Sequence, residues 1–124
     1  MKNLALFCMF SLFATLFGCQ AKVPFRSVDA TAFSHELANP AMQLIDVRTA
    51  AEYAEGHIPG ATLMDVGSEN FDAMIRGLDK ERPVALYCRS GRRSKMAAER
   101  VAKAGYEVVE LDGGILSWKG EVER

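Results

Sequence analysis

The sequence predicts an α/β fold in which a parallel sheet carries helices on both faces. Apolar runs of strand length alternate with segments of helical spacing from about residue 24 onward. The runs over 42–47 and 84–87 are almost wholly apolar, as expected for strands that are buried on both sides. In such sheets the crossovers are right-handed, and ligands bind at the carboxyl ends of the strands.

The predicted elements follow one another in a regular order. Strands are predicted over 24–28, 42–47, 61–64, 84–87 and 107–111. Helices are predicted over 29–37, 49–56, 68–78 and 92–104, and a turn over 115–118 closes the domain. The chain of 124 residues shows no repeat and is long enough for one domain only.

Local signals mark where the predicted helices begin and end. Asp29 is expected to cap the first helix, and Ser68 the third. Thr49 and Glu52 have the spacing of a capping box. Gly56 is expected to end the second helix in the left-handed conformation, because glycine adopts that backbone without a steric penalty.

The composition is that of an ordinary globular protein. Hydrophobic residues make up 49% of the chain and charged residues 25%, with a formal net charge of -1. This balance gives no sign of polyanion binding, so a nucleic-acid partner is not expected. Electrostatic specialisation must therefore be local, and the only dense basic cluster comprises Arg89, Arg92, Arg93 and Lys95.

The segment from Cys88 to Ser94 predicts a reactive thiol. Cys88 follows the apolar strand 84–87 and precedes the helix predicted from Arg92. A helix N-terminus and nearby guanidinium groups both lower the pKa of a cysteine and favour its thiolate. The backbone N–H groups of such a loop can also hold an anion. We therefore expect a nucleophile that meets an anionic substrate.

The first 24 residues predict export and lipid attachment. Residues 4–17 form an apolar stretch of about fourteen residues, whereas a membrane span needs roughly twenty. The stretch ends in Leu16-Phe17-Gly18-Cys19, which resembles a bacterial lipobox. We expect a signal over 1–18, lipidation of Cys19, a tether over 19–24 and a domain over 25–124.

This reading places the domain in the bacterial cell envelope. The lipid anchor at Cys19 would hold it on a membrane, facing the periplasm, and Gln20 after the cysteine resembles signals for the outer membrane. The alternatives are an uncleaved anchor, a secreted or soluble periplasmic protein, and a cytosolic protein.

The cysteine count then leaves a single thiol. Cys8 would be removed with the signal and Cys19 would be acylated, so Cys88 would have no partner for an internal disulfide. One cysteine with His35 and His57 is a poor set of metal ligands. We therefore expect neither a metal nor a cofactor.

Several motifs together resemble the rhodanese family of sulfurtransferases. In chain order they are LIDVR (44–48), EY (52–53), GHIPGA (56–61), YCRSGRRS (87–94), and GG (113–114) with Trp118. The resemblance covers residues 25–119. It implies a five-stranded parallel sheet flanked by helices, and a catalytic cysteine that carries a persulfide.

The resemblance gives each residue of the loop an expected role. Cys88 would attack the outer sulfur of a small anionic donor such as thiosulfate, releasing sulfite, and would pass the sulfur to cyanide, a thiol or a protein. Arg89 and Arg92 would bind the donor, and Ser90 and Gly91 would act through their backbone. Arg93 would either contact substrate or brace the loop.

Outside the loop, three polar residues are expected to support the site. Asp46 and Arg48 lie at the end of the neighbouring predicted strand and are expected to form a structural ion pair or to brace a loop, since sulfur transfer needs no carboxylate base. His57 is expected to fix its own loop through hydrogen bonds.

Two other functions compete with sulfur transfer by an enzyme. Phosphatases and arsenate reductases of a related fold use a Cys-x5-Arg loop, but Arg93 follows Cys88 after only four residues, and Ser94 stands next. The shorter loop suits a sulfur atom better than a phosphate. A non-catalytic binding module usually lacks the cysteine, which this chain keeps. A persulfide carrier that serves a protein partner remains open.

Overall fold

The computed structural model describes residues 24–124, and the structural statements below concern those residues. The predicted signal (1–18), the predicted lipidation site Cys19 and positions 19–23 of the predicted tether lie outside them. In the part of the chain that is described, no helix is both long enough and apolar enough to cross a membrane.

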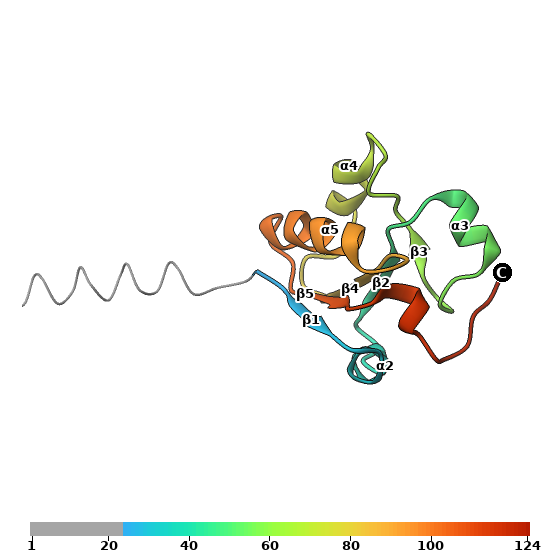
Figure 1. The fold of residues 1–124 in the computed structure, drawn as a ribbon. Coiled ribbons are helices and arrows are strands. Elements are labelled where there is room, and N and C mark those ends of the chain that lie inside the picture. The colour runs from blue at the N-terminus through green and yellow to red at the C-terminus, as the bar shows by residue number, and fades with distance from the viewer. Residues whose placement is uncertain (1–23) are drawn as a thin grey trace, which may run out of the picture.

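Five parallel strands form one sheet in the order β1-β5-β4-β2-β3 (Figure 1). The strands are β1 Arg26–Val28, β2 Gln43–Asp46, β3 Thr62–Leu63, β4 Val84–Tyr87 and β5 Val108–Leu111. The predicted α/β class and the five-stranded parallel sheet are confirmed. Strand β4 has the predicted bounds and is buried along its whole length, because β2 and β5 flank its edges and apolar clusters cover both of its faces.

Helices cover both faces of the sheet (Figure 1). Helices α4 (Phe71–Arg76) and α5 (Arg92–Lys103) lie on one face. Helix α2 (Ala30–Leu37) and the 3-10 helix η1 (Gly114–Ser117) lie on the other. Helix α3 (Ala50–Glu55) follows β2 and lies at the end of the sheet where the C-terminal tail also ends.

Strand β4 divides the two apolar cores by its alternating side chains. Val84 and Leu86 belong to the core under α4 and α5, while Ala85 and Tyr87 belong to the core under α2. Successive side chains of a strand point to opposite faces. The same alternation places Cys88, the residue after β4, in the core on the α5 side.

Two of the predicted caps are present. The Asp29 carboxylate accepts a hydrogen bond from the Ala32 N–H at 2.9 Å and begins α2. The Thr49 hydroxyl accepts from the Glu52 N–H, and the Glu52 carboxylate accepts from the Thr49 N–H, which completes the capping box of α3.

Two other local predictions are wrong. Ser68 accepts a hydrogen bond from the Asn70 N–H in a turn, and α4 begins only at Phe71. Gly56 ends α3 with φ 151° and ψ 137°, which is not the left-handed helical conformation. Its lack of a side chain has a packing reason as well, because a Cβ there would lie 2.7 Å from Val122 Cγ1 of the C-terminal tail.

Candidate active site

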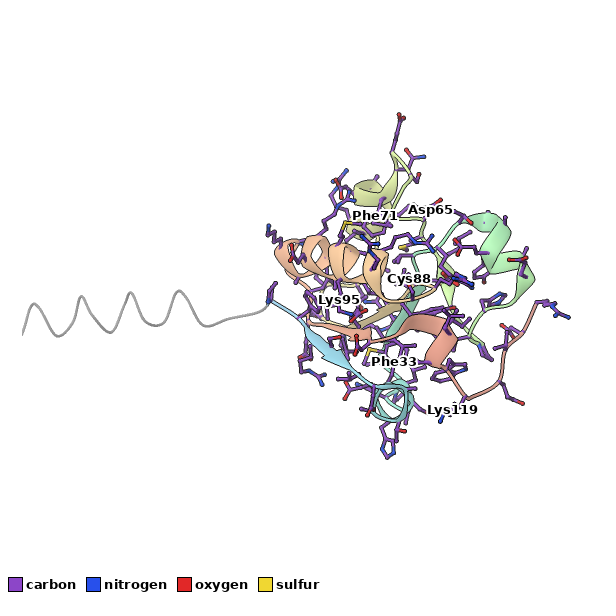
Figure 2. All side chains as sticks on the ribbon, in the orientation of Figure 1. Phe33, Asp65, Phe71, Cys88, Lys95 and Lys119 are labelled. Carbon is purple, nitrogen blue, oxygen red and sulfur yellow. The ribbon has the colours of Figure 1, made fainter. Side chains whose placement is uncertain are left out.

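Cys88 lies at the carboxyl end of the central strand, between the ends of β2 and β5 (Figure 2). Its residue is 1% exposed, and its sulfur faces the turn that leads into α5. This is the edge at which open parallel sheets bind their ligands. The sheet therefore places the predicted nucleophile where the fold class expects a site.

The loop after Cys88 turns back toward the sulfur. The Gly91 N–H donates a hydrogen bond to Cys88 Sγ at 3.0 Å, and the Ser94 hydroxyl lies 3.4 Å from the same sulfur. Gly91 has φ 106°, which favours glycine, and a Cβ there would lie 3.1 Å from the Gly113 nitrogen. The expected backbone role of Gly91 thus has a specific geometry.

Hydrogen bonds lower the pKa of Cys88. Burial raises the pKa of this thiol, but the Ser94 hydroxyl and the backbone N–H groups of Ser94, Gly91 and Ser90 outweigh it. The expected lowering of the pKa is therefore present, and of the two expected causes it comes from the N–H groups at the start of α5 rather than from the arginines. The pKa of Arg93 is raised mainly by its hydrogen bond to Glu52, and the negative charge of Cys88 raises it to a lesser extent.

The GG motif supports the loop from behind. The Ile115 N–H donates to the Cys88 carbonyl at 2.9 Å, and the Leu116 N–H donates to the Arg89 carbonyl at 3.2 Å. Gly114 has φ 62°, and a Cβ there would lie 2.3 Å from the Arg89 carbonyl oxygen. Only glycine lets η1 approach the loop this closely, which explains the motif physically.

Arg93 is held by a carboxylate of α3. Its two terminal nitrogens donate to the two Glu52 oxygens at 2.7 and 2.9 Å, a bidentate pair. The Arg93 hydrogen bond lowers the pKa of Glu52 to about 2, against an opposing effect of burial. The same Glu52 closes the capping box, so Arg93 ties the loop to the start of α3. This geometry favours the bracing role of the two that the sequence left open.

Arg89 and Arg92 differ from Arg93 in their surroundings. Both are exposed, and neither forms an ion pair with any described residue. Ser90 is exposed beside them. Their guanidinium groups are thus available at the rim of the loop for an anion.

The predicted ion pair between Asp46 and Arg48 is present at the end of β2. Arg48 Nη2 lies 2.7 Å from Asp46 Oδ2, and Arg48 Nε donates to both carboxylate oxygens. Arg48 also donates to the Gly56 carbonyl at 2.7 Å, and the Tyr87 hydroxyl donates to Asp46. Burial raises the pKa of Tyr87. The pair joins β2, β4 and the loop before β3.

His57 is hydrogen-bonded within its own loop, as expected. Its Nδ1 lies 3.0 Å from the Tyr53 carbonyl oxygen, and its ring stacks on the Tyr53 ring at a centroid distance of 3.7 Å. Its backbone pairs with Glu123 of the C-terminal tail in both directions. These contacts tie His57 to α3 and to the C-terminal tail, which fits the expected supporting role.

Sequence reasoning missed two buried polar residues behind the nucleophile. Ser94 on α5 and Glu110 on β5 are both 0% exposed, and the Ser94 hydroxyl lies 2.5 Å from Glu110 Oε2. The one available signal was an acidic residue inside the otherwise apolar run 108–111. Among the described residues, no group of three or more potential ligands could hold a metal ion.

Comparison with known proteins identifies the family. The profile of the Rhodanese-like domain matches residues 29–121. A sulfurtransferase of Allochromatium vinosum is 37% identical over 93 residues, which cover 73% of this chain and 85% of that protein. A thiosulfate sulfurtransferase of Shewanella oneidensis is 33% identical over 78 residues, covering 62% and 75%. A rhodanese-like domain protein of Staphylococcus aureus has a crystal structure with a TM-score of 0.70 and 27% identity, covering 80% of this chain and 97% of that one. The chain therefore belongs to the rhodanese-like domain family.

Proposed function

We propose that the protein is a rhodanese-type sulfurtransferase that carries sulfur as a persulfide on Cys88. The observation that carries this proposal is the buried Cys88 thiol with a lowered pKa, toward which the Gly91 N–H points at 3.0 Å. A thiolate held by backbone donors is a ready nucleophile. Membership of the family and the names of the sulfurtransferase relatives support the same chemistry.

The proposed donor is thiosulfate or a related sulfane anion. Arg89 and Arg92 are exposed in the loop and form no ion pair within residues 24–124, whereas Arg93 is already neutralised by Glu52. Two unpaired guanidinium groups provide charge-assisted hydrogen bonds for the oxygens of a sulfonate-like group. The relative from Shewanella oneidensis is named for thiosulfate, which supports this choice.

The reaction has two displacement steps. The Cys88 thiolate attacks the outer sulfur of thiosulfate, the S–S bond of the donor breaks with its electron pair leaving on sulfite, and a persulfide forms. A nucleophilic acceptor, such as cyanide, a thiol or a protein thiol, then attacks the terminal sulfur. The persulfide bond breaks and its electron pair returns to Cys88 as a thiolate.

A phosphatase reading is disfavoured by the position of Ser94. This residue stands where the longer loop would place its arginine, and its hydroxyl lies between Cys88 Sγ and Glu110 Oε2. A carboxyl group, rather than a cation, thus lies behind the sulfur. A phosphate would therefore lack, at this position, the charge-assisted hydrogen bonds that the arginine of the longer loop provides.

Intact-mass measurement tests the proposal. Incubation with thiosulfate should add one sulfur, about 32 Da, to the protein, and cyanide should remove it as thiocyanate. Cys88→Ser should give neither the adduct nor thiocyanate, while Ser34→Ala, which changes an exposed side chain of α2 outside the loop, serves as the control and should keep the adduct. Undiminished transfer by Cys88→Ser would overturn the proposal.

We also propose that the domain is attached to the bacterial cell envelope through Cys19, facing the periplasm. The support is the short apolar stretch that ends in Leu16-Phe17-Gly18-Cys19. Membrane fractionation with mass spectrometry of the mature N-terminus tests it. We expect cleavage before Cys19 and acylation of its thiol, and release of Cys19→Ser from the membrane. A soluble wild-type product would contradict the proposal.

A further inference from the structure

Glu110 is a buried carboxyl group that the displacement chemistry leaves unused. It lies on β5 with 0% exposure. Its Oε1 accepts a hydrogen bond from the Ser27 hydroxyl at 2.6 Å, and its Oε2 lies 2.5 Å from the Ser94 hydroxyl. A buried ionised carboxylate is costly unless hydrogen bonds and opposite charge compensate it. Whether Glu110 is ionised or neutral therefore depends on the groups that surround it.

The charge near Glu110 is only partly compensated. Lys95 Nζ lies 3.3 Å from Oε1 and 3.4 Å from Oε2, but its shorter contact is with Asp112 at 2.9 Å. The Lys95 side chain is also 42% exposed, so solvent screens it. On the two neighbouring strands, the residues in register with Glu110 are Ser27 of β1 and Leu86 of β4, and neither carries a charge.

The Ser94 hydroxyl links this carboxyl group to the nucleophile. A hydroxyl has one proton to donate, and Ser94 has two potential acceptors, Cys88 Sγ at 3.4 Å and Glu110 Oε2 at 2.5 Å. If Ser94 donates to Glu110, it can only accept from Cys88, which must then be a thiol. If Ser94 donates to a Cys88 thiolate, the short contact with Glu110 requires the proton to lie on the carboxyl group.

We propose that Glu110 is a positioning residue that takes up the proton of Cys88 through Ser94. The Cys88 S–H proton passes to Ser94 Oγ while the Ser94 hydroxyl proton passes to Glu110 Oε2. The products are a Cys88 thiolate, which accepts from Ser94 and the Gly91 N–H, and a neutral carboxylic acid. One negative charge moves from the carboxylate to the sulfur, and the net charge of the site is unchanged.

Glu110 thus receives the Cys88 proton that must leave before the thiolate can attack the donor. The inference rests on the proposed function, in which Cys88 carries the transferred sulfur. The cycle then begins and ends with a Cys88 thiolate, so the proton can stay on Glu110 throughout transfer from thiosulfate to cyanide. A purely structural Glu110, which only joins β1, β5 and α5, would stay ionised whatever the state of Cys88.

Infrared spectroscopy of the full chain at neutral pH separates the two roles. A protonated carboxyl group has a C=O stretching band distinct from that of a carboxylate, and exposed acidic side chains are ionised at neutral pH. We expect this band in the wild type and its loss in both Glu110→Gln and Cys88→Ser. The thiolate is followed by its ultraviolet absorbance, with the Cys88→Ser spectrum subtracted to remove Cys8, Cys19 and the tyrosines.

Two serine variants provide the matched comparison. Ser94→Ala breaks the route between sulfur and carboxyl group while leaving the Glu110 side chain in place, and it should lose the band. Ser27→Ala removes the other hydroxyl partner of Glu110 and leaves the route intact, so it should keep the band and the thiolate.

The proposal is overturned if the wild type shows no thiolate absorbance, or shows thiolate absorbance without the C=O band. It is also overturned if the C=O band persists in Glu110→Gln or in Cys88→Ser. Failure of the proposed function would appear separately, as the absence of a sulfur adduct on a wild type that shows both signals.

Discussion

Two buried carboxyl groups flank the strand that carries Cys88, and the protein treats them differently. Asp46 ends β2 and Glu110 lies in β5, and both are 0% exposed. Asp46 has its own guanidinium group, with Arg48 Nη2 at 2.7 Å. Glu110 has two hydroxyl partners and a share of Lys95. The two carboxyl groups are therefore equally buried, and they differ in their partners: a guanidinium group for Asp46, and two hydroxyls with a shared ammonium group for Glu110.

The arginines of the loop also differ in whether an acidic side chain pairs with them. Arg93 is neutralised by Glu52, while Arg89 and Arg92 have no acidic partner among the described residues. A paired charge supports the architecture, and an unpaired one is free to meet a ligand. The substitutions below test this division, beginning with the largest expected effect.

Breaking the compensated pair should have the largest effect. Asp46→Asn leaves Arg48 buried without its counter-charge, so we expect a loss of about 3–5 kcal/mol in the free energy of unfolding. Denaturant-induced unfolding measures it. The exposed, singly paired Asp72→Asn provides a matched control and should cost less than about 1 kcal/mol. Equal stability of Asp46→Asn and wild type would show that the Asp46–Arg48 ion pair does not stabilise the fold.

Removing an unpaired arginine should affect donor binding more than stability. Arg89→Ala or Arg92→Ala removes a charge-assisted contact worth about 1–3 kcal/mol, so the KM for thiosulfate should rise about 5- to 150-fold. The midpoint of thermal unfolding should hardly change. Steady-state thiocyanate formation measures the KM. An unchanged KM in both variants would show that Arg89 and Arg92 are ordinary surface residues with no role in donor binding.

The Glu52–Arg93 pair should give the protein a pH dependence at low pH. Because the pKa of Glu52 falls from its ordinary value of 4.5 to about 2, its contribution is fully present above about pH 4.5 and is lost as the pH falls toward 2. The Glu52 side chain is 21% exposed and that of Arg93 34%, so the pair should contribute only about 1 kcal/mol to the free energy of unfolding.

Comparing acid unfolding of wild type and Glu52→Gln measures this contribution. The two proteins should differ in stability at pH 6 and converge near pH 2. A difference that stayed constant across this range would exclude the charge of Glu52 as its cause.

Glu110→Gln should have the smallest effect on stability. Glutamine keeps the size of the side chain and can bond both Ser27 and Ser94, so the free energy of unfolding should change by less than about 1 kcal/mol. Denaturant unfolding beside Asp46→Asn is the measurement. A loss as large as that of Asp46→Asn would show that folding depends equally on both carboxyl groups, and the contrast between them would disappear.

The sequence by itself determined the parts of the protein that neighbouring residues encode. Alternating apolar runs predicted the α/β class, and β4 was found with the predicted bounds. The Thr49–Glu52 box and the Asp29 cap involve residues three apart, so their spacing is visible in the chain. The place of Cys88 at a strand end follows from the same local pattern. The signal and the lipidation of Cys19 stay predictions.

Only the tertiary structure decided which charges meet around Cys88. Arg93 and Glu52 are 41 residues apart, and Ser94 and Glu110 are 16 apart. Their contacts depend on strand order, on register and on the packing of α5 and α3 around the end of the sheet, none of which a local pattern specifies. Composition showed four basic residues in one cluster, but which of them are neutralised depends on acidic residues brought in from α3 and β5. The fold thus assigns the free charges, because pairing requires proximity in space.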